Sequence, residues 1–227
     1  MRERLKGHTW FLSILGVAML VVLLFVAGGR LSYWQAWLYL SANVLFLGLT
    51  LWTLRDDASL RQERLFPGRG MKAWDKTYWL VSIPLYFLTI VTAGVDAGRA
   101  HWTGRLPALI YALAVLAYGL GQSLTLWAKR VNHFFSSVAR LQVDRGQTVC
   151  CEGPYRYVRH PGYLGGLVFG LSAPVLLGSL VALVPAALAA LALVGRTVLE
   201  DGMLLDGLEG YRTYANGVKF RLVPRIW

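Results

Sequence analysis

One short stretch of the chain combines residue types that could hold a polar ligand. Residues 152–166 read E-G-P-Y-R-Y-V-R-H-P-G-Y-L-G-G, with two arginines, one histidine and three tyrosines between apolar blocks. Pro154 and Pro161 lack an N–H donor and push the preceding residue toward extended backbone, so we expect a loop here rather than a regular helix. Burying so many polar groups beside apolar segments is costly unless they have partners. This loop is therefore the first candidate site.

Further ionisable residues follow the last apolar block. Arg196 and Glu200 are spaced i, i+4 and share one helical face. Alone, they fit an arginine that reaches toward the membrane surface and pairs with a neighbouring acid. A lone histidine such as His160 is more often structural, but between Arg159 and Pro161 it fits a ligand contact. Taken together, the two groups favour a functional site.

The surrounding sequence is that of an all-α, polytopic helical membrane protein. Of its 227 residues 56% are apolar and 15% are charged, and the apolar residues form long blocks. Six hydrophobic segments are expected, at about 10–27, 34–54, 78–95, 107–128, 163–177 and 180–194. We expect the first to be a retained span rather than a cleaved signal peptide. Between segments two and three we expect a loop with a short amphipathic piece around residues 60–66.

The last two segments are short for a membrane crossing. Each has about 15 residues, against the ~20 that a span needs, and only Gly178 and Ser179 join them. We expect a tight helical hairpin, and the sequence leaves open whether it is tilted or stops short of crossing. The predicted organisation is N-terminal transmembrane helices over residues 1–128, followed by a catalytic region over residues 129–227 with a loop, a hairpin and a cytoplasmic C-terminal segment.

The basic residues predict the orientation. Of 23 Lys and Arg, only Arg30, Arg99 and Arg105 lie in the alternate loops, and all others lie in the terminal tails and the intervening connections. This is the positive-inside pattern, with both termini cytoplasmic. The net charge of +11 is thus a topology signal, and no nucleic-acid partner is expected.

Other features argue against competing functions. Segments one to four carry no Asp, Glu, Lys, Arg or His in their apolar cores, which disfavours a transporter or proton pump. Gly119-Leu120-Gly121 follows no strand, so close helix packing is a better interpretation than a dinucleotide site. Cys150 and Cys151 are adjacent and are interpreted as small apolar fillers, with a reactive thiol pair as the alternative. No metal site is expected.

Several motifs resemble those of one family. Gly153-Pro154-Tyr155-Arg156-Tyr157, Arg159-His160-Pro161-Gly162-Tyr163-Leu164-Gly165, Arg196-x-x-x-Glu200-Asp201, Tyr211-x-x-Tyr214 and Arg221-Leu222-Val223-Pro224 occur in this order. The C-terminal part, residues 130–227, is similar to the isoprenylcysteine carboxyl methyltransferase family. These are integral membrane enzymes that use S-adenosylmethionine and are related to phospholipid N-methyltransferases. Two features depart from the family pattern: Gln147 stands where eukaryotic members have histidine, and the acidic run is only Glu200-Asp201.

The resemblance implies a cofactor pocket and two catalytic residues. It places Glu200 against the cofactor and Arg196 against the substrate carboxylate, both as catalytic residues. The implied cofactor-binding residues are Gln142, Gln147, Thr148, Val149, Cys150, Tyr155, Arg159, His160, Pro161, Gly162, Tyr163 and Glu200. The acceptor is expected to be a lipid-tailed or prenylated molecule that enters from the bilayer. The protein is expected in a prokaryotic plasma (inner) membrane, with its active site facing the cytoplasm.

The chemistry of this reaction agrees with the residues. A carboxylate is already ionised near neutral pH and needs no general base, so the absence of an evident catalytic dyad is compatible with carboxyl O-methylation. An amine acceptor would need a base, for which Glu200 and His160 are the candidates. The alternatives left open are N-methylation of an amine-headed lipid and a non-enzymatic scaffold or carrier. The chain is too short for the usual spans of the related sterol reductases.

Overall fold

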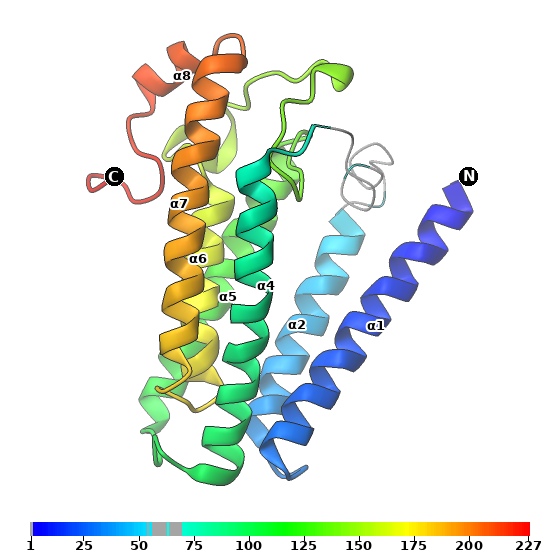
Figure 1. Cartoon of the computed structure of the whole chain (residues 1–227), viewed down its shortest axis with the longest axis vertical. Helices are drawn as coiled ribbons and strands as arrows, with labels where there is room; N and C mark the ends of the chain where they lie inside the picture. Colours follow the sequence, from blue (N-terminus) through cyan, green and yellow to red (C-terminus); the bar gives the residue numbers. More distant parts are fainter. Residues whose placement is uncertain (1, 54, 56–62, 64–69) are drawn as a thin grey trace.

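The computed structural model is a bundle of long helices, with no strand among the residues it describes (Figure 1). These are residues 2–53, 55, 63 and 70–227, and for residues 2–13 only the backbone is considered. The helices are α1 (Arg2–Gly28), α2 (Trp34–Thr53), α4 (Ala73–Val95), α5 (Ala108–Val131), α6 (Pro161–Leu176), α7 (Leu183–Gly207) and α8 (Tyr211–Gly217). The single-turn helices are η1 (Asp96–Ala100), η2 (Val143–Arg145) and η3 (Gly153–Arg156). The all-helical prediction is confirmed.

Four of these helices are long and apolar enough to cross a membrane. They cover Trp34–Thr53, Ala73–Ala100, Ala108–Val131 and Leu183–Gly207, and two shorter apolar helices cover Ile14–Gly28 and Pro161–Leu176. Apolar side chains such as Leu80, Leu109 and Leu191 remain exposed on their outer faces. Exposed apolar side chains along such lengths indicate contact with lipid, and the chain is a polytopic helical membrane protein.

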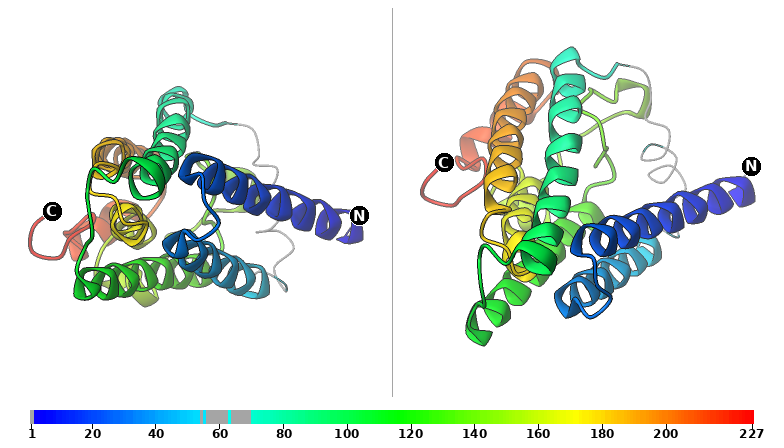
Figure 2. Two further views of the ribbon diagram at one scale, coloured as in Figure 1. Left: turned by 90° about the horizontal axis from the view of Figure 1, so that it is seen from below. Right: turned by 60° about the horizontal axis from the view of Figure 1, so that its bottom comes forward.

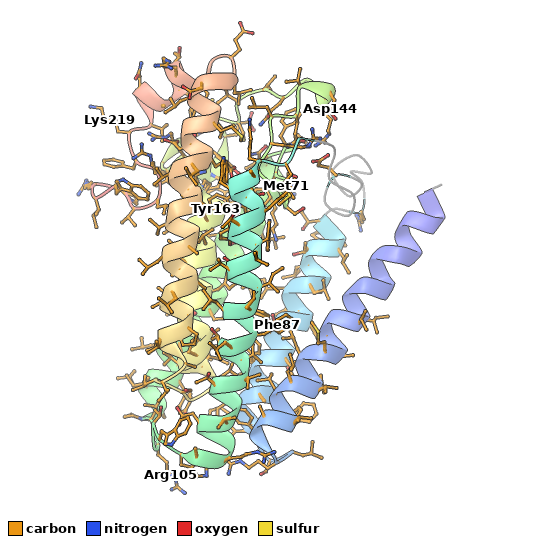
Figure 3. The ribbon with its side chains drawn as sticks, in the orientation of Figure 1. Met71, Phe87, Arg105, Asp144, Tyr163 and Lys219 are labelled. Carbon is orange, nitrogen blue, oxygen red and sulfur yellow. The ribbon has the colours of Figure 1, made fainter. Side chains whose placement is uncertain are left out.

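Two ends of the bundle differ in character. We call the end that carries residues 132–160 and the C-terminal segment the polar end, and the opposite end, with the short connections, the turn end. Figure 3 shows Asp144 and Lys219 at the polar end, Arg105 at the turn end, and Tyr163 nearer to Asp144 than to Arg105. The N-terminus of α1 lies toward the polar end, at the edge of the bundle (Figure 1).

The connection between α6 and α7 reaches the turn end. Ser179 Oγ donates to buried Asp96 Oδ2 at 2.6 Å, and Leu180 N donates to Thr103 Oγ1 at 2.9 Å. Tyr33 OH, just before α2, donates to Leu177 O at 2.6 Å. Gly178 lies just after the end of α6 with φ +83°, the left-handed conformation that glycine adopts most readily. The α6–α7 hairpin therefore extends to the turn end, where the α1–α2 and α4–α5 connections also lie.

α6 lies at the centre of the bundle and contacts α2, α4, α5 and α7, as the view along the bundle shows (Figure 2). Its closest neighbour is α5. A Cβ on Gly165 would lie 2.5 Å from Gly121 O and 2.3 Å from Thr125 Oγ1. The close packing predicted at the Gly119–Gly121 pair is confirmed for Gly121, whereas a Cβ on Gly119 would meet nothing within 4 Å.

Several predicted boundaries were wrong, mostly because a helix continues past its apolar run. α4 begins at Ala73 rather than near residue 78, and α7 ends at Gly207 rather than near residue 194. α6 begins at Pro161, since proline is favourable at the first helical position, where its missing N–H has no partner to lose. The predicted loop thus ends at His160. The predicted amphipathic piece around residues 60–66 lies outside the described residues, apart from Glu63.

Candidate active site

A buried carboxylate organises the polar end. Asp201 on α7 is fully buried and lies within hydrogen-bond distance of four side chains. Arg159 reaches it through Nε and Nη2 at 2.8 Å each, Arg221 through Nε at 2.8 Å and Tyr211 through its hydroxyl at 2.9 Å. His160 Nε2 lies 3.2 Å from Asp201 Oδ1, which requires the tautomer protonated at Nε2 because a carboxylate only accepts. Asp201 thereby joins the loop, α7 and the C-terminal segment.

The Arg159 side chain is committed to this cluster. Its Nη1 donates to Val218 O at 2.8 Å and Lys219 O at 3.0 Å, in addition to the two bonds to Asp201. Burial acts to lower the pKa of Arg159, but hydrogen bonding and charge from Asp201 outweigh it, so the pKa is raised and the group stays protonated. Nε, Nη1 and Nη2 of Arg159 thus all bond to the protein, and the predicted role of Arg159 in binding a cofactor stays a prediction.

Glu200, the next residue of α7, faces a different direction from Asp201. It accepts a short hydrogen bond from Tyr163 OH and lies 4.0 Å from Arg196 Nε. The Tyr163 ring is stacked parallel to the His160 ring at a centroid distance of 5.6 Å. Tyr163 therefore contacts the predicted site residues of both the loop and α7.

A pocket at the polar end, which we call the polar pocket, has a volume of about 90 Å³. Every predicted cofactor-binding residue except Pro161 lines it, and His160 and Glu200 both border it. Tyr211 and Tyr214, which the sequence analysis named only as part of a motif, line it too, and further lining comes from Asn132, Phe134, Phe135, Ser136, Val138, Arg140, Met203, Leu204 and Leu208. The role of the predicted residues in binding a cofactor stays a prediction.

Some of these residues mainly hold the loop together. Gln142 Nε2 donates to Phe134 O at 2.6 Å, its Oε1 accepts from Arg145, and its backbone N donates to Gln147 Oε1 at 2.7 Å. Arg140 binds Glu63 through Nε at 2.9 Å and Nη2 at 2.7 Å. The two glutamines therefore brace the wall of the pocket, which limits the donors they can offer to a ligand.

Neutral hydroxyls and a thiol line the inner wall of the polar pocket. Tyr155 OH accepts from Asn132 Nδ2 at 3.1 Å, and Tyr214 OH donates to Tyr155 O at 2.7 Å. Burial raises the pKa of Tyr155 and of Tyr214 above the ordinary value, so both phenols keep their protons. Burial likewise raises the pKa of the Cys150 thiol, which disfavours the alternative of a reactive thiol pair.

A second, larger space lies among α4, α5, α6 and α7. This apolar cavity has a volume of about 640 Å³ and is lined by side chains such as Ile83, Phe87, Phe169 and Leu193. Among the described residues that line it, only Lys129 and Arg196 are charged, and both are cations. Such a cavity suits an apolar chain, and the two cations would attract an anionic head group.

The polar pocket and the apolar cavity share a wall. Phe135, Ser136, Gly162 and Tyr163 line both spaces. A Cβ on Gly162 would lie 2.5 Å from the Phe135 ring, so only glycine fits in this wall without displacing Phe135. Arg196 borders the cavity and Glu200 borders the pocket, one helical turn apart.

These features define a class: a polytopic helical membrane protein in which a polar pocket at one end adjoins an apolar cavity within the bundle. The model of the isoprenylcysteine carboxyl methyltransferase (ICMT) family matches residues 110–206, from α5 to the last turn of α7. The match confirms the resemblance predicted from the motifs and supports a membrane methyltransferase. A search of curated proteins found no match.

Three residues of the site were missed as such by the sequence analysis. Asp201 appeared only as part of a motif; the arginines of two other motifs, Arg159 and Arg221, were a signal that an acid must pair with them if they are buried. Lys129 and Asp75 were not considered either. Asp75 stands at the start of α4, outside the apolar run of its segment, and no pattern in the sequence connects it with Arg196.

Proposed function

We propose that this protein is an S-adenosylmethionine-dependent membrane methyltransferase that O-methylates the carboxylate of a lipid-tailed acceptor. The observation that carries the proposal is the shared wall between the polar pocket and the apolar cavity. A water-soluble methyl donor on one side and an apolar acceptor on the other would meet at Gly162 and Tyr163. The family match over residues 110–206 supports the same reaction class.

The residues of the polar pocket fit the chemical groups of this cofactor. The Glu200 carboxylate can accept from an ammonium group or from ribose hydroxyls, and the Asn132 amide can donate and accept. Phe134 and Phe135 offer aromatic faces for a purine or a cation. We expect the loop at 132–151 to adjust around the cofactor when it binds. When bound, the cofactor supplies an electrophilic methyl group.

The chain's contribution is to align the reactants and exclude water. Tyr163 fills the boundary between the two spaces, and its hydrogen bond to Glu200 and its stacking on His160 fix its ring. Arg196 and Lys129 would hold the acceptor carboxylate at the polar end of the cavity. Alignment and removal of water account for most of the acceleration in such a displacement, since an ionised carboxylate needs no base.

Binding and turnover test the proposal separately. Calorimetry of purified protein with S-adenosylhomocysteine should show binding, which Glu200→Ala weakens at least about tenfold. Transfer of a labelled methyl group should occur to a prenyl-thioether carboxylic acid and not to the amine with the same tail. Absence of binding to the wild-type protein would leave only the scaffold alternative. Turnover of the amine alone would instead establish N-methylation.

A further inference from the structure

Arg196 lies in a cage of aromatic rings and carboxylates. Its guanidinium carbon lies 4.6 Å from the Tyr78 ring centroid, 5.3 Å from that of Trp79 and 5.3 Å from that of Tyr163. Nη2 donates to Ser137 O at 3.1 Å. The rings and this carbonyl set the position of the guanidinium, and the side chain is only 5% exposed.

Among the described residues, Asp75 is the nearest carboxylate to this guanidinium. Asp75 Oδ1 lies 2.8 Å from Arg196 Nε, against 4.0 Å for Glu200 Oε2. The Nε–H does not point at Oδ1, and both atoms are buried without a hydrogen-bond partner in the part of the chain that the structure describes. The other oxygen, Oδ2, accepts from Ala139 N at 2.7 Å. Asp75 is thus held in place by the backbone and acts on Arg196 through its charge rather than through an aligned hydrogen bond.

The proposed reaction changes the charge beside Arg196. The acceptor oxygen forms a bond to the methyl carbon, the carbon–sulfur bond breaks with its electron pair staying on sulfur, and no proton moves. The acceptor thereby changes from an anion to a neutral ester. A buried guanidinium that relied on the acceptor for its counter-charge would lose it at that moment, and it would also bind the anionic acid much more strongly than the product.

We propose that Asp75 is a positioning residue that supplies Arg196 with a resident counter-charge and so sets its preference between an acid and its methyl ester. The proposal rests on the proposed O-methylation. Asp75 keeps Arg196 in place in the acceptor-free and product-bound states. The charge of Asp75 also weakens the binding of the acceptor carboxylate to Arg196 in the ground state. The negative charge of that carboxylate diminishes in the transition state, so the transition state loses less of this binding.

Asp75→Asn tests this inference with little change of shape. Asparagine keeps an oxygen for the Ala139 N–H but loses the charge. We expect the ratio of affinities for a farnesyl-thioether carboxylic acid and for its methyl ester to rise at least about tenfold, in competition binding with S-adenosylhomocysteine present. KM for the acid should fall, and kcat should fall with it. Asp75→Glu should restore the wild-type ratio in part. An unchanged ratio, or a raised KM with unchanged kcat, would overturn the proposal.

A ligand-free measurement covers the case in which the probe acid does not bind. Asp75→Asn should lower the melting temperature when Arg196 is present, because the buried guanidinium then loses its counter-charge. It should not do so in an Arg196→Met background, which has no guanidinium at this position. Equal effects in both backgrounds would refute the counter-charge. This result does not depend on catalysis. The proposed function is refuted by a different observation, namely that the wild-type protein neither binds S-adenosylhomocysteine nor transfers a methyl group.

Discussion

At the scale of single residues, Asp201 is the group on which most others depend. One buried carboxylate pairs with two guanidinium groups, of Arg159 and Arg221, and accepts from Tyr211 and His160. Burying charges is costly, and such a cluster is stable only while each buried charge has a partner and the hydrogen bonds are made. His160 and the C-terminal segment therefore owe their positions to a residue that need not touch any ligand.

Asp201→Asn is expected to destabilise the protein by about 3 kcal/mol, because two arginines lose their common counter-charge. The melting temperature in detergent should fall, and limited proteolysis should cut first in the segment 208–227. Asp206→Asn is the matched control, since Asp206 pairs with Arg212 only at 3.8 Å and both side chains are largely exposed. Equal effects of the two substitutions would contradict the role assigned to Asp201.

The two adjacent cysteines should differ in reactivity. Cys150 lines the polar pocket, and burial raises the pKa of its thiol, whereas Cys151 is exposed. At pH 8 the thiolate fraction of Cys150 is smaller than that of an ordinary thiol. Iodoacetamide should therefore alkylate the Cys151→Ser variant, which retains only Cys150, more slowly than the Cys150→Ser variant, which retains only Cys151. The rate for Cys150 should keep rising with pH beyond the ordinary thiol pKa. S-adenosylhomocysteine should protect Cys150 alone, and protection of both would argue against a ligand in the pocket.

At the scale of elements, the unequal lengths of α6 and α7 create the site. With 16 residues α6 is about 24 Å long, and with 25 residues α7 is about 37 Å long. Both meet at the turn end, so α7 continues past the start of α6 and carries Arg196, Glu200 and Asp201 alongside the loop that precedes α6. If the two helices were equally long, α7 would have no residues beyond the N-terminus of α6 to line a pocket.

Close packing of α5 against α6 fixes where the α6 N-terminus lies. Gly121→Ala would place a methyl group 2.6 Å from Phe169 N and 2.8 Å from Gly165 O, so the helices must separate, at a cost of about 1–3 kcal/mol. Thermal unfolding should show the loss, and methyl transfer should fall as the shared wall opens. Gly119→Ala on the same helix is the control, because nothing lies within 4 Å of the added carbon. A destabilised Gly119→Ala protein would show that glycine-to-alanine changes in α5 are harmful for another reason.

At the scale of the whole molecule, a ligand would reach the polar pocket from water and the apolar cavity from the lipid bilayer. The polar pocket lies at the end that carries residues 132–160 and the C-terminus, and the apolar cavity lies among the lipid-facing helices. Among the described residues, Arg140, Arg145, Arg159, Arg212 and Lys219 lie at the polar end, and the positive-inside pattern predicts that this end faces the cytoplasm. A soluble cofactor and a lipid-tailed acceptor would then never compete for the same entrance.

Cysteine accessibility tests this orientation. In a background with Cys150 and Cys151 replaced by serine, Arg105→Cys at the turn end should react with a membrane-impermeant maleimide in intact cells (Figure 3). Asp144→Cys and Lys219→Cys, at the polar end, should react only after the membrane is permeabilised. The reverse pattern would place the polar pocket outside the cytoplasm and deny it a supply of cofactor.

The sequence by itself determined the class of the protein and much of the local character of its site. Long apolar blocks form helices in lipid, and local spacing places Arg196 and Glu200 on one face of a helix and keeps Arg159 beside His160 in the loop. Helix ends were less predictable, because α4 and α7 continue into polar residues that tertiary contacts stabilise. Only the tertiary structure decided that Asp75 meets Arg196, that Asp201 joins the loop to the C-terminal segment, and that the two spaces share Gly162 and Tyr163. Such contacts join residues far apart in the chain, and packing between helices, rather than any local pattern, brings them together.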